Sequence, residues 1–244
     1  MATDAHFVLI PGAGSDPAYW GALRAVLADR GTASTAVDLP CTDATAQLED
    51  YAGVVAAAVR SAGEVPVVLV AHSFGAFTAP LVTDVVPVER IVLVAPMIPA
   101  PSEAASDWWE ATGQPAAHEA AAHAAGLTPP LDLNELFYNT CTEAQRRQAA
   151  VWDRDQAEAP FVQPWPRTAW PDVSTEVVAL AHDLLFPPAF LAQVSRHRLG
   201  LPIRTAPGGH MGMVSHPAEL AALLLADLSG EAGSPAPPAS GTDR

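Results

Sequence analysis

A chain of 244 residues, half of them hydrophobic, can bury a large core without disulfides and fits a single α/β domain that carries an insertion. The formal net charge of −15 and the lack of any basic run argue against nucleic acid or an anionic membrane surface as a partner. No apolar stretch reaches the roughly 18 to 20 residues that a membrane-spanning helix requires.

Cysteine usage and the amino-terminal residues favour a cytoplasmic protein. The two cysteines, Cys41 and Cys141, belong to no spaced set typical of a structural metal site. We interpret both as reduced thiols, with a disulfide between them as the alternative. The first residues lack the basic region of a signal peptide and lead directly into an apolar run. We expect a monomer or a homodimer.

Residues 1–96 alternate short apolar runs with helical patterns. Runs that are apolar on both faces predict buried strands of a parallel sheet, and a 3.6-residue periodicity predicts helices. The expected strands are His6–Ile10, Ala33–Leu39, Val67–Ala71 and Glu89–Pro96. The expected helices run from near Pro17 to Gly31, from Gln47 to Ser61 and from Ala76 to Val82.

Residues 97–170 break this rhythm. They are rich in Ala, Pro and Trp and show helical patches, without a strand pattern, at Ser106–Thr112, Asn134–Tyr138 and Glu143–Asp153. Five of the six tryptophans fall here, namely Trp108, Trp109, Trp152, Trp165 and Trp170. We interpret the segment as a helical cap over the carboxyl ends of the strands, where open α/β sheets bind ligands. For each tryptophan, the alternative is that it only packs the cap onto the body.

Residues 171–228 resume the alternation. Strands are expected at Thr175–Ala181 and Leu201–Ala206, and helices at Pro188–Arg196 and Pro217–Leu228. This order predicts right-handed crossovers and a doubly wound, mostly parallel sheet of about six strands. The α/β body would comprise residues 1–96 and 171–228, with the Gly, Ser, Pro and Ala-rich residues 229–244 as a disordered tail.

The strand at Val67–Ala71 leads into a pentapeptide typical of a nucleophile elbow. Ser73 has the small residues Ala71 and Gly75 two positions to either side, as the close packing of strand and helix at such a turn requires. The helix expected behind Ser73 would direct its positive end toward an oxyanion formed there. An ordinary turn after the strand is the alternative interpretation.

A serine nucleophile needs a neighbouring base, and the base needs an orienting acid. His210 follows the last expected strand and Asp183 follows the strand before it, so both would emerge at the same edge of the sheet as Ser73. The order Ser, Asp, His is that of an α/β-hydrolase. Two other acids, Asp153 and Asp172, lie in or next to the insertion and are weaker candidates.

An oxyanion hole needs two backbone N–H groups aimed at one point. We expect one from Phe74, directly after the nucleophile, and one from Ala13, whose glycine neighbours allow a close approach. The rival interpretation of Gly12–Gly14 is a dinucleotide-binding loop with Asp38 as the ribose-binding acid. Pro17 stands where that fingerprint needs its third glycine, which disfavours it.

With these segments in place, the chain resembles the α/β-hydrolases of the plant methylesterase and hydroxynitrile lyase type. The resemblance rests on the first strand with its glycine loop, on the elbow at 71–75, and on residues 183–190 and 208–220. Two positions depart from the family pattern. The elbow opens with Ala71 where glycine is usual, and the first loop reads Pro11–Gly12 where relatives often carry a His-Gly pair.

The resemblance implies a helical cap and neither a cofactor nor a metal. It also implies a complete site, with Ser73, Asp183 and His210 as the triad, and Ala13 and Phe74 as oxyanion donors. We place four further residues in the substrate pocket, namely Gly12, His72, Trp109 and Met211.

These residues predict a serine hydrolase that cleaves a small hydrophobic ester through an acyl-enzyme. One alternative is a lyase or cyclase that uses His210 as a base, and another is a ligand-binding homologue with negligible turnover, since a fold does not determine its chemistry. In the hydroxynitrile lyases of this family, a lysine follows the catalytic histidine and a threonine lines the first loop. Met211 and Gly12 occupy those positions here, which favours the esterase.

Overall fold

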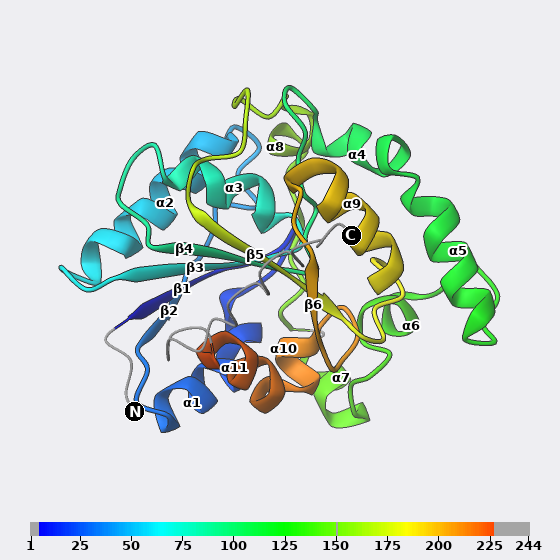
Figure 1. Ribbon diagram of the computed structural model, residues 1–244. Coiled ribbons are helices and arrows are strands. Elements are labelled where there is room, and N and C mark those ends of the chain that lie inside the picture. Colours follow the sequence, from blue (N-terminus) through cyan, green and yellow to red (C-terminus); the bar gives the residue numbers. More distant parts are fainter. Residues whose placement is uncertain (1–4, 150, 227–244) are drawn as a thin grey trace, which may run out of the picture.

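Six parallel strands form one sheet in the part of the chain that the computed structural model describes, residues 5–149 and 151–226 (Figure 1). The strands are β1 (His6–Ile10), β2 (Ser34–Ala36), β3 (Val67–His72), β4 (Arg90–Val94), β5 (Ser174–Leu180) and β6 (Ile203–Ala206). Their spatial order is β2-β1-β3-β4-β5-β6, with parallel pairing throughout. The predicted doubly wound parallel sheet is confirmed.

The sheet reverses its winding direction between β1 and β3. From β1 the chain steps outward to β2, then crosses to the other side of β1 and continues from β3 to β6. The register pairs Ile10 with Ala71 and His72 with Val94, so the carboxyl ends of β1, β3 and β4 lie level. Loops leave in opposite directions at such a reversal, and the crevice between them is where α/β sheets bind ligands.

Helices cover both faces of the sheet (Figure 1). One face carries η1 (Pro17–Trp20), α1 (Gly21–Asp29), α10 (Gly212–Ser215) and α11 (Pro217–Ala226), and the other carries α2 (Leu48–Ser61), α3 (Gly75–Val82) and α9 (Pro188–Leu199).

Hydrogen bonds and glycine determine where two of these helices begin and end. The Asp50 carboxylate accepts the Gln47 N–H in a capping box that begins α2, and Gly200 ends α9 in a left-handed conformation. Every residue of β3 and α3 is buried, so this pair forms the centre of the core.

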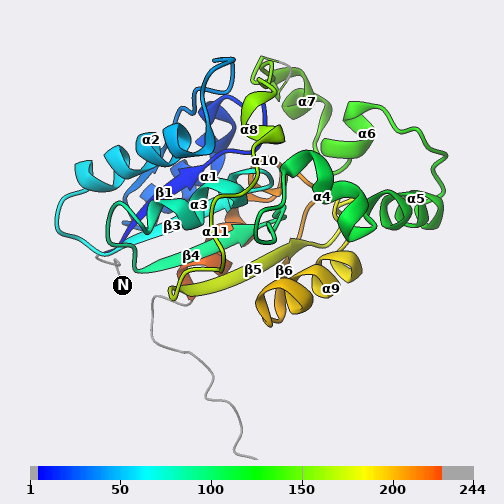
Figure 2. The ribbon, with the colours of Figure 1, turned by 90° about the horizontal axis from the view of Figure 1, so that it is seen from above.

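Between β4 and β5 the described chain forms five short helices. They are α4 (Ala105–Thr112), α5 (Gln114–Ala124), α6 (Leu133–Phe137), α7 (Glu143–Ala149) and α8 (Ala159–Val162). Seen from above, α4, α5 and α6 gather on one side of the sheet (Figure 2). These helices belong to the segment predicted as a cap.

The structure differs from the predicted elements in several places, and three of the differences concern α5, α7 and β2. Helix α5 is absent from the prediction because its apolar residues are nearly all alanine, which favours helix but produces no apolar periodicity. The helix predicted to reach Asp153 is described as far as Ala149, and an antiparallel bridge joins Asp153 to Ser15 instead. Strand β2 is shorter than predicted because its neighbour β1 ends at Ile10.

Cys41 and Cys141 are both buried and free. Within the described ranges, no helix has both the length and the apolar character needed to cross a bilayer. The tail predicted at 229–244 lies outside the described residues. The helix predicted to reach Leu228 is described as far as Ala226.

Replacing Gly75 with alanine should destabilise the fold. A Cβ atom there would lie 2.7 Å from the carbonyl oxygen of Pro11 and 3.1 Å from Cγ2 of Ile10, so α3 or β1 would have to shift. We expect the free energy of unfolding, measured by urea titration, to fall by about 1–3 kcal/mol, the usual cost of overpacking.

The matched control is Gly53→Ala on the exposed face of α2, where a Cβ atom meets nothing within 4 Å. Alanine should raise the free energy of unfolding there by roughly 0.5–1 kcal/mol, because it favours helix more than glycine does. Equal changes in the two variants would show that the contact between α3 and β1 is not tight.

Candidate active site

Ser73 occupies the sharp turn between β3 and α3 with a left-handed backbone, at φ = +51°. Such a conformation costs a residue other than glycine about 1–3 kcal/mol. The Ser73 N–H donates to the carbonyl oxygen of Val94 at 3.1 Å. Its own carbonyl oxygen accepts from the N–H groups of Ala76 and Met97, at 3.1 and 3.0 Å. These bonds tie the elbow to β4 and the loop after it, so the strained turn is held by the protein itself.

His210 and Asp183, which follow β6 and β5, form a buried pair. The distance from His210 Nδ1 to Asp183 Oδ2 is 2.8 Å, and the side chains are 1% and 0% exposed. Asp183 Oδ1 accepts the backbone N–H groups of Leu185 and Phe186 at 2.8 and 2.9 Å. Because an ionised carboxylate only accepts hydrogen bonds, Nδ1 of His210 is the donor. Nε2 is then the basic nitrogen of the neutral ring.

One cavity of about 350 Å³ brings most of the predicted site residues together. Those that line it are Gly12, Ala13, His72, Ser73, Trp109, His210 and Met211. Asp183 and Phe74 do not line the cavity, but each contacts a residue that does. Asp183 contacts His210, and the ring of Phe74 stacks on the lining residue Phe161 with 4.2 Å between centroids.

Sequence reasoning missed the other lining residues. They are Gly14, Ser15, Met97, Leu133, Phe137, Tyr138, Asp153, Arg154, Gln156, Phe161 and Leu185. Most belong to the insertion, whose loops carry no periodicity that could indicate a cavity. Leu185 could have been predicted as a lining residue, because it lies two residues after the predicted acid.

Of the insertion tryptophans, Trp109 lines this cavity. Trp108 donates its indole N–H to the carbonyl oxygen of Ile98 at 2.8 Å. Trp165 donates to the carbonyl oxygen of Phe77 at 3.0 Å, and both rings are fully buried. Trp108 also packs on Phe186 and Phe190 of the body, with 5.1 and 5.8 Å between ring centroids, and the bond of Trp165 reaches α3 of the body.

His72 lines the cavity, but its ring is already bonded within the protein. Nε2 lies 3.1 Å from the carbonyl oxygen of His210, and Nδ1 lies 3.1 Å from the hydroxyl of Tyr19, which accepts the Gly12 N–H at 3.1 Å. Since a carbonyl only accepts, Nε2 carries the proton and Nδ1 accepts from Tyr19. Burial and, next, the neighbouring His210 hold the pKa of His72 well below its usual value. The ring stays neutral and offers no free nitrogen to a substrate.

Two backbone N–H groups beside the nucleophile have no hydrogen-bond acceptor among the described residues. They belong to Ala13 and Phe74, the predicted oxyanion donors. The N–H groups of Gly12 and Gly14, on either side of Ala13, both donate to side chains. Donors left open in this way can receive a developing negative charge on an oxygen.

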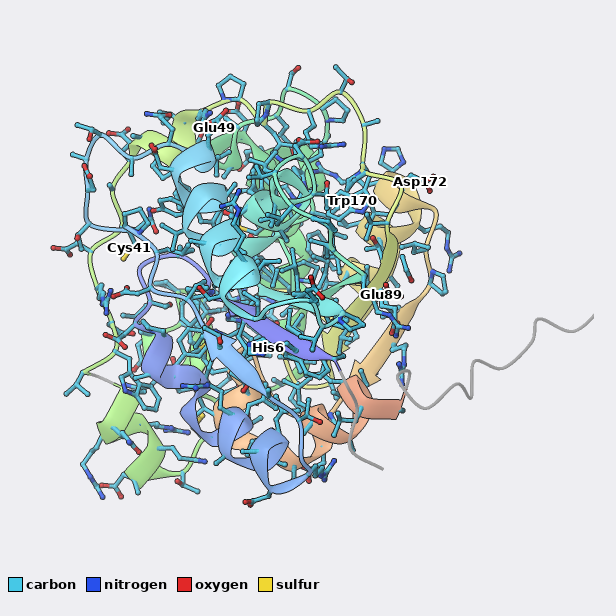
Figure 3. The ribbon with its side chains drawn as sticks, turned by 90° about the vertical axis from the view of Figure 1, so that its left-hand side faces the viewer. His6, Cys41, Glu49, Glu89, Trp170 and Asp172 are labelled. Atoms are coloured by element: carbon cyan, nitrogen blue, oxygen red, sulfur yellow. The ribbon has the colours of Figure 1, made fainter. Side chains whose placement is uncertain are left out.

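The other acids weighed from the sequence have different positions or partners. Asp172 precedes β5 (Figure 3), whereas Asp183 follows it, so the two acids lie at opposite ends of that strand. Asp153 accepts the hydroxyl of Tyr138 at 3.1 Å. Asp38 is ion-paired with Arg154 at 2.6 Å, so it is not free to bind a ribose.

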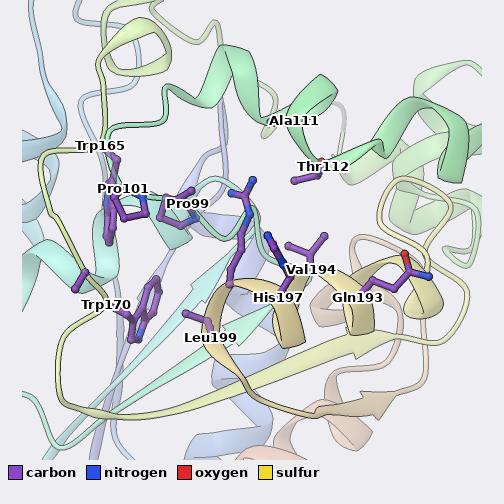
Figure 4. Close-up of a pocket in the computed structure, with 13 residues that line it drawn as sticks. Pro99, Pro101, Ala111, Thr112, Trp165, Trp170, Gln193, Val194, His197 and Leu199 are labelled. Atoms are coloured by element: carbon purple, nitrogen blue, oxygen red, sulfur yellow. The ribbon is translucent and has the colours of Figure 1, made fainter.

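A second cavity, of about 560 Å³, opens between the insertion and α9 (Figure 4). Its walls include Pro99, Pro101, Trp165, Trp170 and His197. None of the predicted triad or oxyanion residues is among its described lining. The smaller cavity is therefore the candidate active site.

A parallel sheet with a strained serine after β3, an acid after β5 and a histidine after β6 defines the α/β-hydrolase class of fold. The model of the alpha/beta hydrolase family matches residues 7–223, and the chain belongs to this family. The predicted membership of the α/β-hydrolases is confirmed. A comparison with curated proteins gives no match.

Solved structures share the fold at low sequence identity. Polyneuridine aldehyde esterase aligns with a TM-score of 0.74 and 22% identity, over 92% of this chain and 99% of its own. A pyrethroid hydrolase from Sphingobium faniae JZ-2 aligns at 0.71 and 21%, over 94% and 99%. An extracellular α/β-hydrolase from a Paenibacillus species aligns at 0.71 and 20%, over 91% and 98%.

Replacing Asp183 with asparagine should abolish most activity without unfolding the protein. The Leu185 and Phe186 N–H groups would keep the amide oxygen, so the amide nitrogen would face His210 and donate to Nδ1. The ring proton would then sit on Nε2, and kcat for an activated aryl ester should fall by roughly 10⁴-fold. Asp172→Asn, at an exposed position, is the matched control and should leave kcat unchanged. Loss of activity in that variant instead would mean that the acid is misassigned.

Proposed function

We propose that the protein hydrolyses small hydrophobic esters through an acyl-enzyme on Ser73. The observation that carries this proposal is the single cavity that holds Ser73 and His210, with the buried acid behind the histidine and two N–H groups without an acceptor. Acyl transfer needs a nucleophile, an oriented base and oxyanion donors, and each has a candidate here. The names of the structural neighbours, an esterase and a hydrolase among them, agree with it.

In the proposed mechanism, Ser73 Oγ attacks the ester carbonyl carbon while Nε2 of His210 takes the hydroxyl proton. The carbonyl oxygen becomes negative and accepts the N–H groups of Ala13 and Phe74, next to the positive end of α3. The imidazolium, stabilised by Asp183, then protonates the departing alcohol oxygen as its bond to the acyl carbon breaks. Water then attacks the acyl carbon while Nε2 of His210 takes one of its protons. The bond from the acyl carbon to Ser73 Oγ breaks, Oγ regains that proton from His210, and the carboxylic acid leaves.

The cavity lining favours a neutral, hydrophobic substrate. Its apolar members include Met97, Trp109, Phe137, Phe161 and Leu185. Arg154 is the one lysine or arginine in the described lining, and its guanidinium is ion-paired with Asp16 and Asp38. An anionic substrate would therefore find no unpaired basic side chain there, whereas an aromatic or alkyl group could bury about 150–250 Å² per ring contacted.

A fluorophosphonate should test the nucleophile directly. The wild-type protein should gain one phosphonyl group, located on Ser73 by peptide mass spectrometry, and lose its hydrolysis of p-nitrophenyl butyrate. Ser73→Ala should show no adduct, and its kcat should fall by about 10⁴-fold or more. The control is Ser102→Ala, another serine with a positive φ, which lies outside the cavity lining and should keep both properties. Absence of turnover in the wild-type protein would favour a ligand-binding homologue.

The hydroxynitrile lyase alternative requires groups that are absent from the two positions where those lyases carry them, residues 12 and 211. Cyanide leaves as an anion, so a cation should stand beside it and a hydroxyl should hold the substrate oxygen. Met211, which lines the cavity directly after His210, carries no charge. A Cβ atom at Gly12 would lie 3.1 Å from Cβ of Ser73, so the threonine of the lyases would crowd the nucleophile here.

A substrate panel should separate the two activities. We expect hydrolysis of an aryl ester, a higher kcat/KM for hydrophobic esters than for the acetate of a small polar alcohol, and no cyanide release from mandelonitrile above the uncatalysed rate. Cyanide release that disappears in Ser73→Ala would overturn the esterase assignment. An equal response across the ester series would contradict the proposed hydrophobic pocket.

A further inference from the structure

A segment of the insertion, residues 152–156, crosses the loop after β1. We call this segment the strap. An antiparallel bridge joins Ser15 to Asp153. The Asp16 N–H donates to the carbonyl oxygen of Trp152 at 2.8 Å, and the Arg154 N–H donates to that of Gly14 at 2.7 Å. The strap therefore pairs by its backbone with the loop that carries Ala13.

The side chain of Gln156 adds a bond at the centre of this contact. Its Oε1 accepts the Gly14 N–H at 2.9 Å. Its Nε2 donates to the hydroxyl of Tyr51 on α2 at 3.1 Å and to the carbonyl oxygen of Ala157 at 3.0 Å. Since a backbone N–H can bond only to the amide oxygen, the orientation of Gln156 is determined by its partners. Gln156 thus links the loop to a helix of the body.

The loop and the strap are in close contact at Gly14. Its φ is +54°, and a Cβ atom there would lie 2.5 Å from the carbonyl oxygen of Arg154. The Arg154 side chain also pairs with Asp16 and, at 2.6 Å, with Asp38. These groups are partly exposed, so the ion pairs contribute less to the contact than the backbone bonds do.

The bonds on either side of Ala13 leave its N–H little freedom. The Ala13 N–H belongs to the peptide between Gly12 and Ala13. The Gly12 N–H, bonded to Tyr19, orients the preceding peptide, between Pro11 and Gly12. The Gly14 N–H, bonded to Gln156, orients the following peptide, between Ala13 and Gly14. We propose that Gln156 is a positioning residue of the oxyanion hole, which directs the Ala13 N–H by holding the next peptide plane. This inference rests on the proposed ester hydrolysis.

A donor that is aimed wrongly weakens binding of the oxyanion far more than binding of the neutral ester. Loss of the Gln156 bond should therefore lower kcat and leave KM nearly unchanged. Gln156 also lines the cavity, so a residue that merely contacts the substrate would raise KM instead. The split between kcat and KM separates these two roles.

Gln156→Met removes the acceptor and keeps the length of the side chain. The matched control is Gln163→Met. Gln163 also links the insertion to α2, accepting the Leu48 N–H at 2.7 Å and donating to Glu49 at 2.7 Å, but it lies outside the cavity lining. We expect Gln156→Met to lower kcat for p-nitrophenyl butyrate by about 10- to 100-fold, less than complete loss of an oxyanion donor costs. Gln163→Met should keep the wild-type kcat, whatever its effect on the thermal unfolding temperature.

Two further measurements complete the test. A trifluoromethyl ketone, whose adduct with Ser73 carries an oxyanion, should bind Gln156→Met more weakly by the same factor as the loss in kcat/KM. Gln156→Glu keeps an oxygen for Gly14 and should restore most of kcat. If Gln156→Met does not fold, Arg154→Met should still lower kcat by about threefold at unchanged KM, because it loosens the same strap.

Three results would overturn the inference. They are an unchanged kcat in Gln156→Met, an equal loss in Gln163→Met, or a rise in KM alone. If Gln156→Met does not fold, an unchanged kcat in Arg154→Met would overturn it too. The proposed function itself would be refuted by a wild-type protein that shows neither ester turnover nor a Ser73 adduct. If the wild-type protein hydrolyses the ester and Gln156→Met has the same kcat, only the role of Gln156 is refuted.

Discussion

The left-handed backbone of Ser73 is the constraint on which the rest of this structure depends. A positive φ at a residue with a side chain is unfavourable, so the turn persists only because its surroundings hold it. Burial of all of β3 and α3 supplies that hold, and backbone bonds to Val94 and Met97 complete it. The turn works only if strand and helix approach closely, and that approach requires the absence of a side chain at Gly75. The same close packing of β3 against α3 therefore determines both the position of Ser73 and the direction of α3.

Electrostatics around the histidine follow from burial. His210 donates to a carboxylate that receives two more backbone N–H groups, so a proton gained at Nε2 would be stabilised in a site with little water. The ring of His72 lies 4.7 Å away, measured between centroids, and a charge on it would oppose an imidazolium at His210. Burial keeps His72 neutral, and both of its ring nitrogens are hydrogen-bonded, Nδ1 to Tyr19 and Nε2 to the carbonyl oxygen of His210. The neutral ring of His72 therefore places no positive charge beside His210.

The insertion does more than line the cavity, because it also bonds to the loops that carry candidate catalytic groups. The strap pairs with the loop of Ala13. Thr140 accepts the Gly209 N–H at 2.8 Å, next to His210, and Asn139 donates to the carbonyl oxygen of His182 at 2.8 Å, next to Asp183. Residues of the insertion thus bond next to Ala13, Asp183 and His210, on three separate loops of the body.

What the sequence determined by itself was local or periodic. Apolar runs and glycine-rich turns predicted the parallel sheet and the elbow at Ser73, and the order of strand ends predicted Asp183 and His210, because parallel strands all end at one edge. The walls of the cavity were decided only by the tertiary structure. Gln156 and Phe161 come from irregular loops whose positions depend on packing against distant strands, and no periodicity encodes such contacts. Residues 152 and 153 show the reason most clearly. The sequence predicts them as the end of a helix, yet their backbones pair with Ser15 and Asp16, some 140 positions earlier, and belong to the strap.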